Sequence, residues 1–188
     1  MSDRDYCYPP DFTVLRNKLD IRDTPTLEAA ERQLVTQRLL EAVPAGDFDL
    51  AHLKAIHRHL FQDVYEWAGE IRTGEIAKDD SRFQPRRFIE VGMADVHRRI
   101  VAAGYFQATS PETFADGAGP VLGDVNHVHP FREGNGRTQL QYLKRLAEQA
   151  GHGLNFGRLD REAWMEASRR SNAGDHEAIT HCIRQALL

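Results

Sequence analysis

The run from His129 to Arg137 constrains this chain more than any other segment, because it places a flexible glycine turn directly before a helical pattern. Gly134, Asn135 and Gly136 all tolerate a positive φ, so successive backbone N–H groups there can turn inward and form a concave anion site. Leucine and alanine residues then recur at helical spacing through position 147. We therefore predict that the glycine loop opens a helix, with the positive end of the helix dipole facing the loop.

The charged residues around this loop are of the types that phosphate chemistry requires. Arg137 adds a cation with forked donors. Glu133 is our candidate ligand for Mg²⁺, which commonly lies between a carboxylate and phosphate oxygens. His129 precedes Pro130, so a helix running toward it should end there and present the imidazole as a candidate general base. Each part alone has a simpler interpretation, such as a turn or a solvated carboxylate, but the combination in this order is unlike a chance match.

The run resembles the signature of the Fic family, His-x-Phe-x-(Asp/Glu)-Gly-Asn-Gly-Arg-x-x-Arg. Positions 129–137 match it throughout, and the stretches 8–22, 57–72 and 164–175 are also similar to Fic proteins. The resemblance therefore covers nearly the whole chain. It implies an all-α fold, a compact Fic-type helical domain over residues 1–188, with a short β-hairpin called the flap at about residues 70–85.

The resemblance also implies an activity, the transfer of AMP from Mg-ATP to a Ser, Thr or Tyr hydroxyl of a target protein. In that scheme His129 is the general base, Phe131 anchors the loop and Glu133 holds Mg²⁺. The α and β phosphates are cradled by Gly134, Asn135, Gly136 and Arg137.

Residues 70–85 lose the helical period and are interpreted as the flap. The turn cluster consists of Lys78, Asp79, Asp80 and Ser81, and Phe83 follows it. In the family, the edge of this hairpin pairs with the target segment, which is strand addition to a free edge. The alternative is an ordinary surface hairpin.

Leu140 replaces the last arginine of the family signature. In the family, that arginine usually contacts the γ phosphate and pairs with an inhibitory glutamate. Three interpretations stay open: altered triphosphate binding, altered inhibition, or an apolar residue that extends its helix face. Either Arg137 carries the phosphate contacts alone, or a more distant basic residue such as Lys144 or Arg145 compensates.

The remaining pattern is mostly helical. Helices are expected near residues 27–39, after a cap at Asp49, near residues 88–101, after Ser110 and Pro111, and after caps at Asp160 and Asp175. The helix that leads to His129 contains three glycines and Pro120, which are unfavourable in a helix interior. We expect a kink or a break near Pro120.

Composition and net charge exclude further classes of function. The chain has 188 residues with 41% hydrophobic and 28% charged residues, which is ordinary for one globular domain. A net charge of −4 argues against nucleic-acid binding as the main role. No signal peptide or transmembrane stretch is evident, and two distant cysteines favour reduced thiols. We expect a cytoplasmic bacterial protein that binds neither membranes nor nucleic acid directly.

Regulation is inferred from a missing motif. Many Fic proteins carry an inhibitory helix with the pattern Ser/Thr-x-x-x-Glu-Gly/Asn, and the nearest match, residues 24–29 with Glu28, fails at its last position. This resembles the bacterial Fic toxins that a separate small antitoxin protein inhibits. Family analogy then suggests a type II topoisomerase subunit as the target, and a chain that is competent and harmful when expressed alone.

Three rival functions remain open from the sequence. A Fic relative that transfers the γ phosphate has lost the second loop glycine, whereas Gly136 is retained here, which favours AMP. A catalytically silent Fic fold that acts as a binding partner is supported by Leu140 and opposed by His129 and Glu133. A generic helical nucleotide-binding module has little support, because no P-loop or dinucleotide fingerprint is present.

Overall fold

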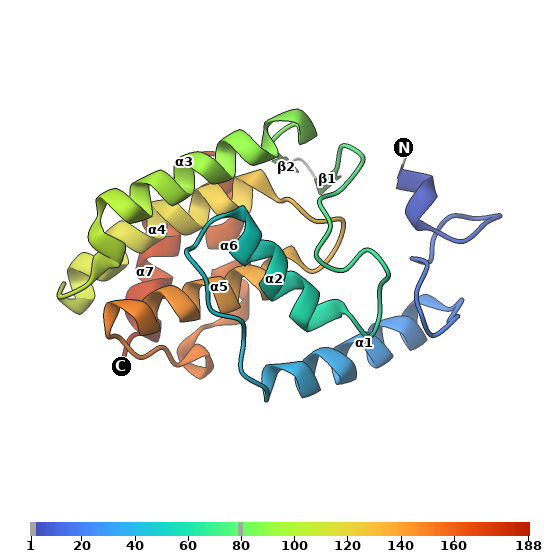
Figure 1. The fold of residues 1–188 in the computed structure, drawn as a ribbon, viewed down its shortest axis with the longest axis horizontal. Coiled ribbons are helices and arrows are strands. Elements are labelled where there is room, and N and C mark those ends of the chain that lie inside the picture. The colour runs from blue at the N-terminus through green and yellow to red at the C-terminus, as the bar shows by residue number, and fades with distance from the viewer. Residues whose placement is uncertain (1–2, 79–80) are drawn as a thin grey trace.

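Helix α4 (Pro111–Val128) runs through the middle of the fold in the computed structural model (Figure 1). It contacts α3 (Ile89–Ala102), α5 (Asn135–Ala150), α6 (Arg161–Asn172) and α7 (Glu177–Ala186). The buried face of α4 is almost entirely apolar or glycine, so its neighbours pack closely against it. This arrangement confirms the all-α fold class, and it fixes the C-terminal end of α4, where His129 lies.

The structure describes residues 3–78 and 81–188. Helix α1 (Thr24–Leu39) packs on α2 (Leu50–Phe61), which in turn packs on α5 (Figure 1). Short 3₁₀ turns cover Asp3–Tyr6, Arg86–Phe88, Gly104–Phe106 and Phe156–Arg158. Among the described residues, we find no helix with both the length and the hydropathy that a membrane span requires.

Three predicted helix starts are confirmed by their capping side chains. The cap expected at Asp175 is wrong, because His176 is the N-cap of α7 and the Asp175 carboxylate pairs with Arg170. The Asp49 carboxylate accepts the N–H of His52 at 2.8 Å, and Asp160 caps α6 in the same way through Ala163. Ser110 caps α4, with Pro111 as its first residue. The helix expected near residues 88–101 is also present as α3, although Val91 and Val101 face solvent rather than the core.

The break expected near Pro120 is wrong, because α4 is continuous from Pro111 to Val128. The glycines of α4 explain why the helix continues past Pro120. A Cβ at Gly119 would lie 1.9 Å from Oγ1 of Thr180, and one at Gly123 would lie 2.2 Å from Nδ1 of His176. The glycines therefore admit the neighbouring C-terminal segment against α4, and this close packing outweighs the local penalties of glycine and proline.

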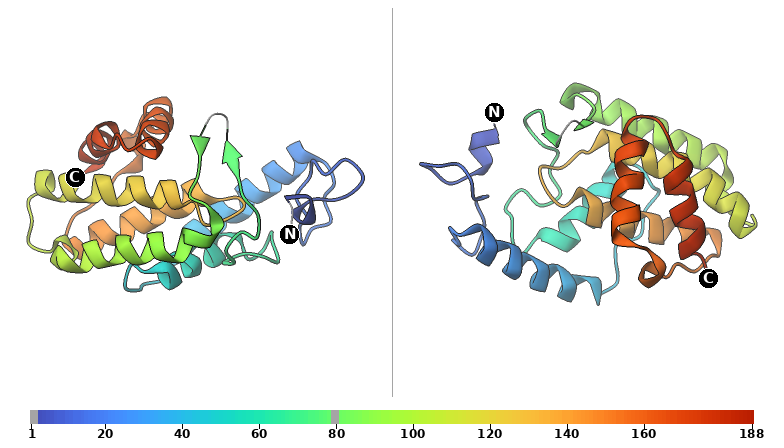
Figure 2. Two further views of the ribbon diagram at one scale, coloured as in Figure 1. Left: turned by 90° about the horizontal axis from the view of Figure 1, so that it is seen from above. Right: turned by 180° about the vertical axis from the view of Figure 1, so that it is seen from behind.

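A two-stranded antiparallel pairing lies inside the expected flap segment. Strands β1 (Ala77–Lys78) and β2 (Ser81–Arg82) pair in the register Ala77 with Arg82 and Lys78 with Ser81. The predicted tip residues Asp79 and Asp80 lie outside the described residues. Figure 2 shows the hairpin and α6 rising from the same side of the α4–α5 layer, and β2 contacts α6.

Candidate active site

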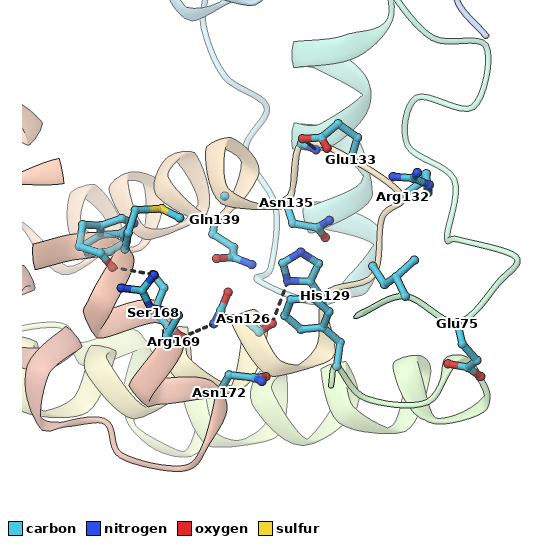
Figure 3. A pocket seen from close by; sticks show the side chains of 16 residues that line it. Glu75, Asn126, His129, Arg132, Glu133, Asn135, Gln139, Ser168, Arg169 and Asn172 are labelled. Carbon is cyan, nitrogen blue, oxygen red and sulfur yellow. Dashed lines mark hydrogen bonds between the residues drawn. The ribbon is translucent and has the colours of Figure 1, made fainter. Parts of the chain in front are cut away.

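His129 lies at the end of α4 with left-handed backbone angles, φ 45° and ψ 62°, rather than in the extended region expected before a proline. Its Nδ1 lies 3.0 Å from the backbone oxygen of Asn126 (Figure 3). Because a carbonyl can only accept, Nδ1 carries the proton and Nε2 carries the lone pair. The fold therefore selects the tautomer that a general base at Nε2 requires.

Arg72 fixes the backbone around His129, a role that no local sequence pattern indicates. Its fully buried guanidinium donates to the carbonyl oxygens of His129 at 2.9 Å, of Gly74 at 2.8 Å and of Gln84. The backbone N–H of Arg72 donates to Pro130 at 2.8 Å. Burial lowers the pKa of Arg72, and the Glu75 carboxylate opposes that shift. The Arg72 side chain thus connects the segments before and after the hairpin, at Gly74 and Gln84, to the backbone of His129.

The loop after Pro130 is held by its own side chains. The Asn135 amide accepts the N–H of Phe131 at 3.0 Å and donates to the Phe131 oxygen at 2.8 Å. Phe131 is buried and stacks on His57, with ring centroids 3.9 Å apart. His57 in turn bonds the Glu133 oxygen through Nε2 at 3.0 Å and accepts the Gly69 N–H at Nδ1. The side chain of Asn135 therefore supports the loop, and its backbone faces the pocket.

Glycine is required at position 134. Its φ is 80°, and a Cβ there would lie 2.3 Å from Cζ of Phe61. As the N-cap of α5, Gly134 offers no side chain to the first N–H groups of the helix. At Gly136, by contrast, a Cβ would meet no atom within 4 Å. The open first turn of α5 thus presents backbone donors and a positive dipole end to the pocket.

Glu133 has the position and chemistry of a magnesium ligand. Its Oε1 accepts the N–H of Gly134 at 2.8 Å, and its side chain is 46% exposed at the pocket wall. The described residues contain no cluster of three or more His, Cys, Asp or Glu side chains suited to a metal. Magnesium commonly binds through one or two carboxylates plus substrate phosphates, so a single carboxylate beside the anion-binding turn fits that ion.

Arg137 is placed differently from the sequence-based expectation. Its guanidinium is directed to α1, where Nη1 lies 2.6 Å from Oε1 of Glu31, and it stacks over the Phe61 ring at 4.7 Å. It does not belong to the residues that line the pocket. The exposed Glu28, the closest match to an inhibitory glutamate, makes no such contact, since the carboxylate that reaches Arg137 is the buried Glu31, one helical turn later.

The pocket around His129 encloses about 470 Å³. Its walls come from the flap, α4, the 132–136 loop, α5 and α6 (Figure 3). Lys144 and Arg145, the predicted compensating cations, do not line the pocket, whereas Arg132 and Arg169 do. Leu140 is partly exposed and is not part of the lining either.

Phe83, expected in the target-docking flap, also lines this pocket. Its ring stacks on the His129 imidazole, with centroids 3.6 Å apart and an interplanar angle of 16°. Lys78 and Ser81 form the closing pair of the hairpin through their backbones. The flap therefore reaches the histidine through the segment that follows its second strand.

Comparison with known proteins identifies the family. The Fic/DOC family model matches residues 47–147, which is more than half of the chain. The loop, His129 and the first turns of α5 all lie within the matched segment. The chain belongs to the Fic/DOC family.

Individual relatives extend the similarity beyond that segment. The chain is 40% identical over 182 residues to the probable protein adenylyltransferase y4lH of Sinorhizobium fredii, covering 96% of this chain and 94% of the relative. It is 31% identical over 176 residues to the probable protein adenylyltransferase Fic of Escherichia coli, covering 93% and 87%. The N-terminal Fic domain of a putative cell filamentation protein from Bartonella quintana, solved with bound ADP, superposes with a TM-score of 0.87 at 26% identity, covering 98% and 94%.

Proposed function

We propose that this protein is a protein adenylyltransferase that transfers AMP from ATP to a hydroxyl side chain of a target protein. The observation that carries the proposal is the Nδ1 bond of His129 to the Asn126 carbonyl, which puts a basic nitrogen beside the open first turn of α5. The two relatives above are named as adenylyltransferases, and the Bartonella structure contains ADP, which supports the same activity.

The reaction follows from this arrangement. Nε2 of His129 accepts the proton of the target hydroxyl, and the hydroxyl oxygen forms a bond to the α phosphorus of ATP. The bond between the α phosphorus and its bridging oxygen breaks, and pyrophosphate leaves with that electron pair. The N–H groups at the start of α5, from Asn135 to Arg137, bind the charge on the phosphates.

Magnesium is the implied cofactor, and Glu133 would hold it. The ion would neutralise phosphate charge. We assign Arg132 and Arg169 as the cations that enter the pocket. We propose that Arg137 acts mainly by shaping the loop, because its guanidinium pairs with Glu31, lies over the Phe61 ring and reaches Oε1 of Glu133 at 3.5 Å.

The target protein is proposed to dock along the flap. Strand addition at this hairpin would bring a Ser, Thr or Tyr hydroxyl to the imidazole, on which the Phe83 ring stacks. Residues 1–188 are proposed to form a single Fic domain. A type II topoisomerase subunit is the target suggested by family analogy.

A toxin role is also part of the proposal, with a small antitoxin protein as the inhibitory partner. Expression of the chain alone in bacteria should then arrest growth, and the His129→Ala variant should permit it. Equal growth with the active protein and the variant, at matched soluble levels, would oppose the toxin role and leave the transferase activity to be tested in vitro.

The test of the activity uses purified protein, Mg²⁺ and a bacterial lysate with ATP labelled at either the α or the γ phosphorus. Label from α-labelled ATP alone, lost in His129→Ala, is the expected result. His181→Ala is the matched control, because His181 is exposed on α7. Label from γ-labelled ATP alone would mean that the protein transfers phosphate rather than AMP. If neither ATP gives a label that depends on His129, the result favours a silent binding partner.

A further inference from the structure

His57 makes a hydrogen bond with each of its ring nitrogens, and both partners are backbone groups. The N–H of Gly69 lies 2.8 Å from Nδ1, and the carbonyl oxygen of Glu133 lies 3.0 Å from Nε2. Because an N–H group can only donate, Nδ1 accepts, and the ring proton is therefore on Nε2. His57 thus donates to a residue 76 positions later in the chain, inside the loop that carries the candidate magnesium ligand.

Aromatic packing holds the imidazole of His57 in place. The side chain is completely buried on α2 and does not line the pocket. The Phe131 ring stacks on it with centroids 3.9 Å apart, and the centroid of the Phe61 ring lies at 4.7 Å. Because a close-packed core leaves little space for a ring to turn over, the Nε2–H group keeps one direction.

The acceptor of this bond belongs to the peptide group between Glu133 and Gly134, whose orientation the local sequence does not fix. Gly134 has φ 80° and ψ 4°, the angles of the third residue in a type II turn. A type I turn reverses the central peptide group and gives the third residue a negative φ, which glycine adopts as readily as a positive one. Glycine therefore allows both orientations, and the bond from His57 selects the observed one.

The selected orientation directs the N–H of Gly134 at the carboxylate of Glu133. The carbonyl and the N–H of one trans peptide group point in opposite directions, so the bond from His57 turns the N–H to the other side. There Oε1 of Glu133 accepts it at 2.8 Å, whereas Arg137 reaches the same oxygen only at 3.5 Å. A reversed peptide group would put a carbonyl oxygen beside Oε1, and two acceptors repel each other. The carboxylate would then leave its place at the pocket wall (Figure 3).

We propose that His57 is a positioning residue for the magnesium ligand. By holding the peptide group between Glu133 and Gly134 in one orientation, it directs the Glu133 carboxylate to the cation that accompanies the phosphates. This assignment rests on the proposed function and deepens it, because it gives a residue outside the pocket a defined effect on the binding of Mg-ATP. Contacts that orient a metal ligand typically account for about 10–100-fold in metal affinity.

Two substitutions separate the two hydrogen bonds of His57. The amide of glutamine reaches the ε position, so His57→Gln retains a donor for Glu133. The amide of asparagine reaches only the δ position, so His57→Asn retains an acceptor for Gly69 and loses the donor for Glu133. Both variants lose the aromatic ring and should be destabilised to a similar degree. The matched control is His59→Asn, because Nε2 of His59 also bonds a backbone oxygen, that of Arg38, at 2.9 Å from the same helix.

Calorimetry measures the binding of ATP to each folded protein, once with excess Mg²⁺ and once with a chelator. Mg²⁺ should strengthen ATP binding to the unaltered protein, to His57→Gln and to His59→Asn. In His57→Asn, the gain from Mg²⁺ should shrink by about 10-fold or disappear, whereas the affinity for ATP without Mg²⁺ should change little. Crystal structures of the two His57 variants should show the Glu133 carbonyl turned over in His57→Asn and in its original direction in His57→Gln.

An unchanged gain from Mg²⁺ in His57→Asn, or a Glu133 carbonyl that keeps its direction in that variant, would overturn the assignment. Equal losses in both His57 variants would also overturn it, because the ring rather than the Nε2 bond would then be responsible. If His57→Asn does not fold, nitrogen NMR of the unaltered protein decides: a proton on Nε2 of His57 supports the assignment, and a proton on Nδ1 overturns it.

Failure of the proposed function has a different signature. A folded, unaltered protein that binds no ATP with or without Mg²⁺ would overturn the proposed function and the magnesium role together. The direction of the Glu133 carbonyl in the two crystal structures would still decide whether His57 orients the peptide group.

Discussion

The carboxylate of Glu31 in α1 forms an ion pair with the guanidinium of Arg137 in α5, with Oε1 and Nη1 2.6 Å apart. The second oxygen of Glu31 accepts the hydroxyl of Tyr65, and Glu31 itself is only 8% exposed. Burial and the Glu31 charge raise the pKa of Tyr65, so that hydroxyl stays protonated and continues to donate. An N-terminal helix is thereby joined to the start of the helix that follows the catalytic loop.

Glu31→Gln should destabilise the protein by about 1–3 kcal/mol, because it leaves Arg137 without its closest counter-charge. The loss should be smaller than that for a fully buried pair, since the Arg137 side chain is 35% exposed to solvent. Urea unfolding at pH 7 measures the effect. Glu28→Gln, an exposed position on the same helix, is the control and should change stability by less than about 0.5 kcal/mol. Similar losses in both variants would contradict a specific role for the pair.

His57 should make stability depend on pH. Burial lowers its pKa to about 4, from an ordinary value of 6.5, and the nearby Arg137 charge acts in the same direction. The folded state therefore binds fewer protons than the unfolded state between these values, and the free energy of unfolding should fall as the pH decreases from about 6.5 to 4. The His57 contribution to that fall is about 3 kcal/mol.

The His57→Gln variant tests this dependence. It should be less stable than the parent at pH 7, because the ring contact with Phe131 is lost, but its stability should vary less with pH across the same range. Denaturant unfolding at several pH values separates the two effects. The control is His59→Gln, on the same helix, which should keep the parental slope. An unchanged slope in His57→Gln would exclude His57 as the source.

Arg72→Lys should damage both the fold and the activity. Lysine keeps the charge but cannot span the three carbonyl groups that the guanidinium bridges, so at least two would lose their donor. We expect a loss of about 2–3 kcal/mol in unfolding free energy and a transfer rate reduced by about 100-fold or more. Arg98→Lys is the control, because Arg98 belongs to an exposed ion pair on α3, and it should change neither stability nor transfer rate. Parental activity in Arg72→Lys would show that the bridge is dispensable.

The two loop glycines should respond differently to alanine. Gly134→Ala combines a left-handed φ with a contact to Phe61, and we expect a loss of at least about 2 kcal/mol together with loss of nucleotide binding. Gly136→Ala has open space and should keep or slightly raise stability, since alanine favours a helix by up to about 1 kcal/mol. Its methyl group would point into the cavity, so ATP binding should weaken. Thermal melts and calorimetry distinguish the two, and equal destabilisation would contradict the assignment.

Local features of the structure could be predicted from the sequence, because neighbouring residues determine them. The helix that opens after Gly134, the cap at Asp49 and the end of α4 at His129 all depend on a few adjacent side chains. The continuity of α4 through Pro120 could not be predicted, since it depends on helices that pack against the glycines from elsewhere in the chain.

The same distinction applies to the candidate site. The types of residue in the loop indicated a base, a metal ligand and an anion-binding turn, and these lie together at one cavity. The direction of Arg137 was not predictable, because its partner Glu31 is more than 100 positions away in the sequence. The role of Arg72 was not predictable for a related reason, because the carbonyl groups that a buried arginine bridges are recognised only from three-dimensional contacts.

The Glu31–Arg137 pair also bears on whether the loop and its histidine can be grafted onto another protein. The segment that carries the family match, residues 47–147, contains the histidine and the loop but neither α1 nor α6. A graft of that segment would carry Arg137 without its counter-charge and Asn126 without the α6 contacts that orient it. The loop from His129 to Arg137 therefore depends on contacts outside the matched segment, and redesign of this enzyme must keep α1 and α6 together with the loop.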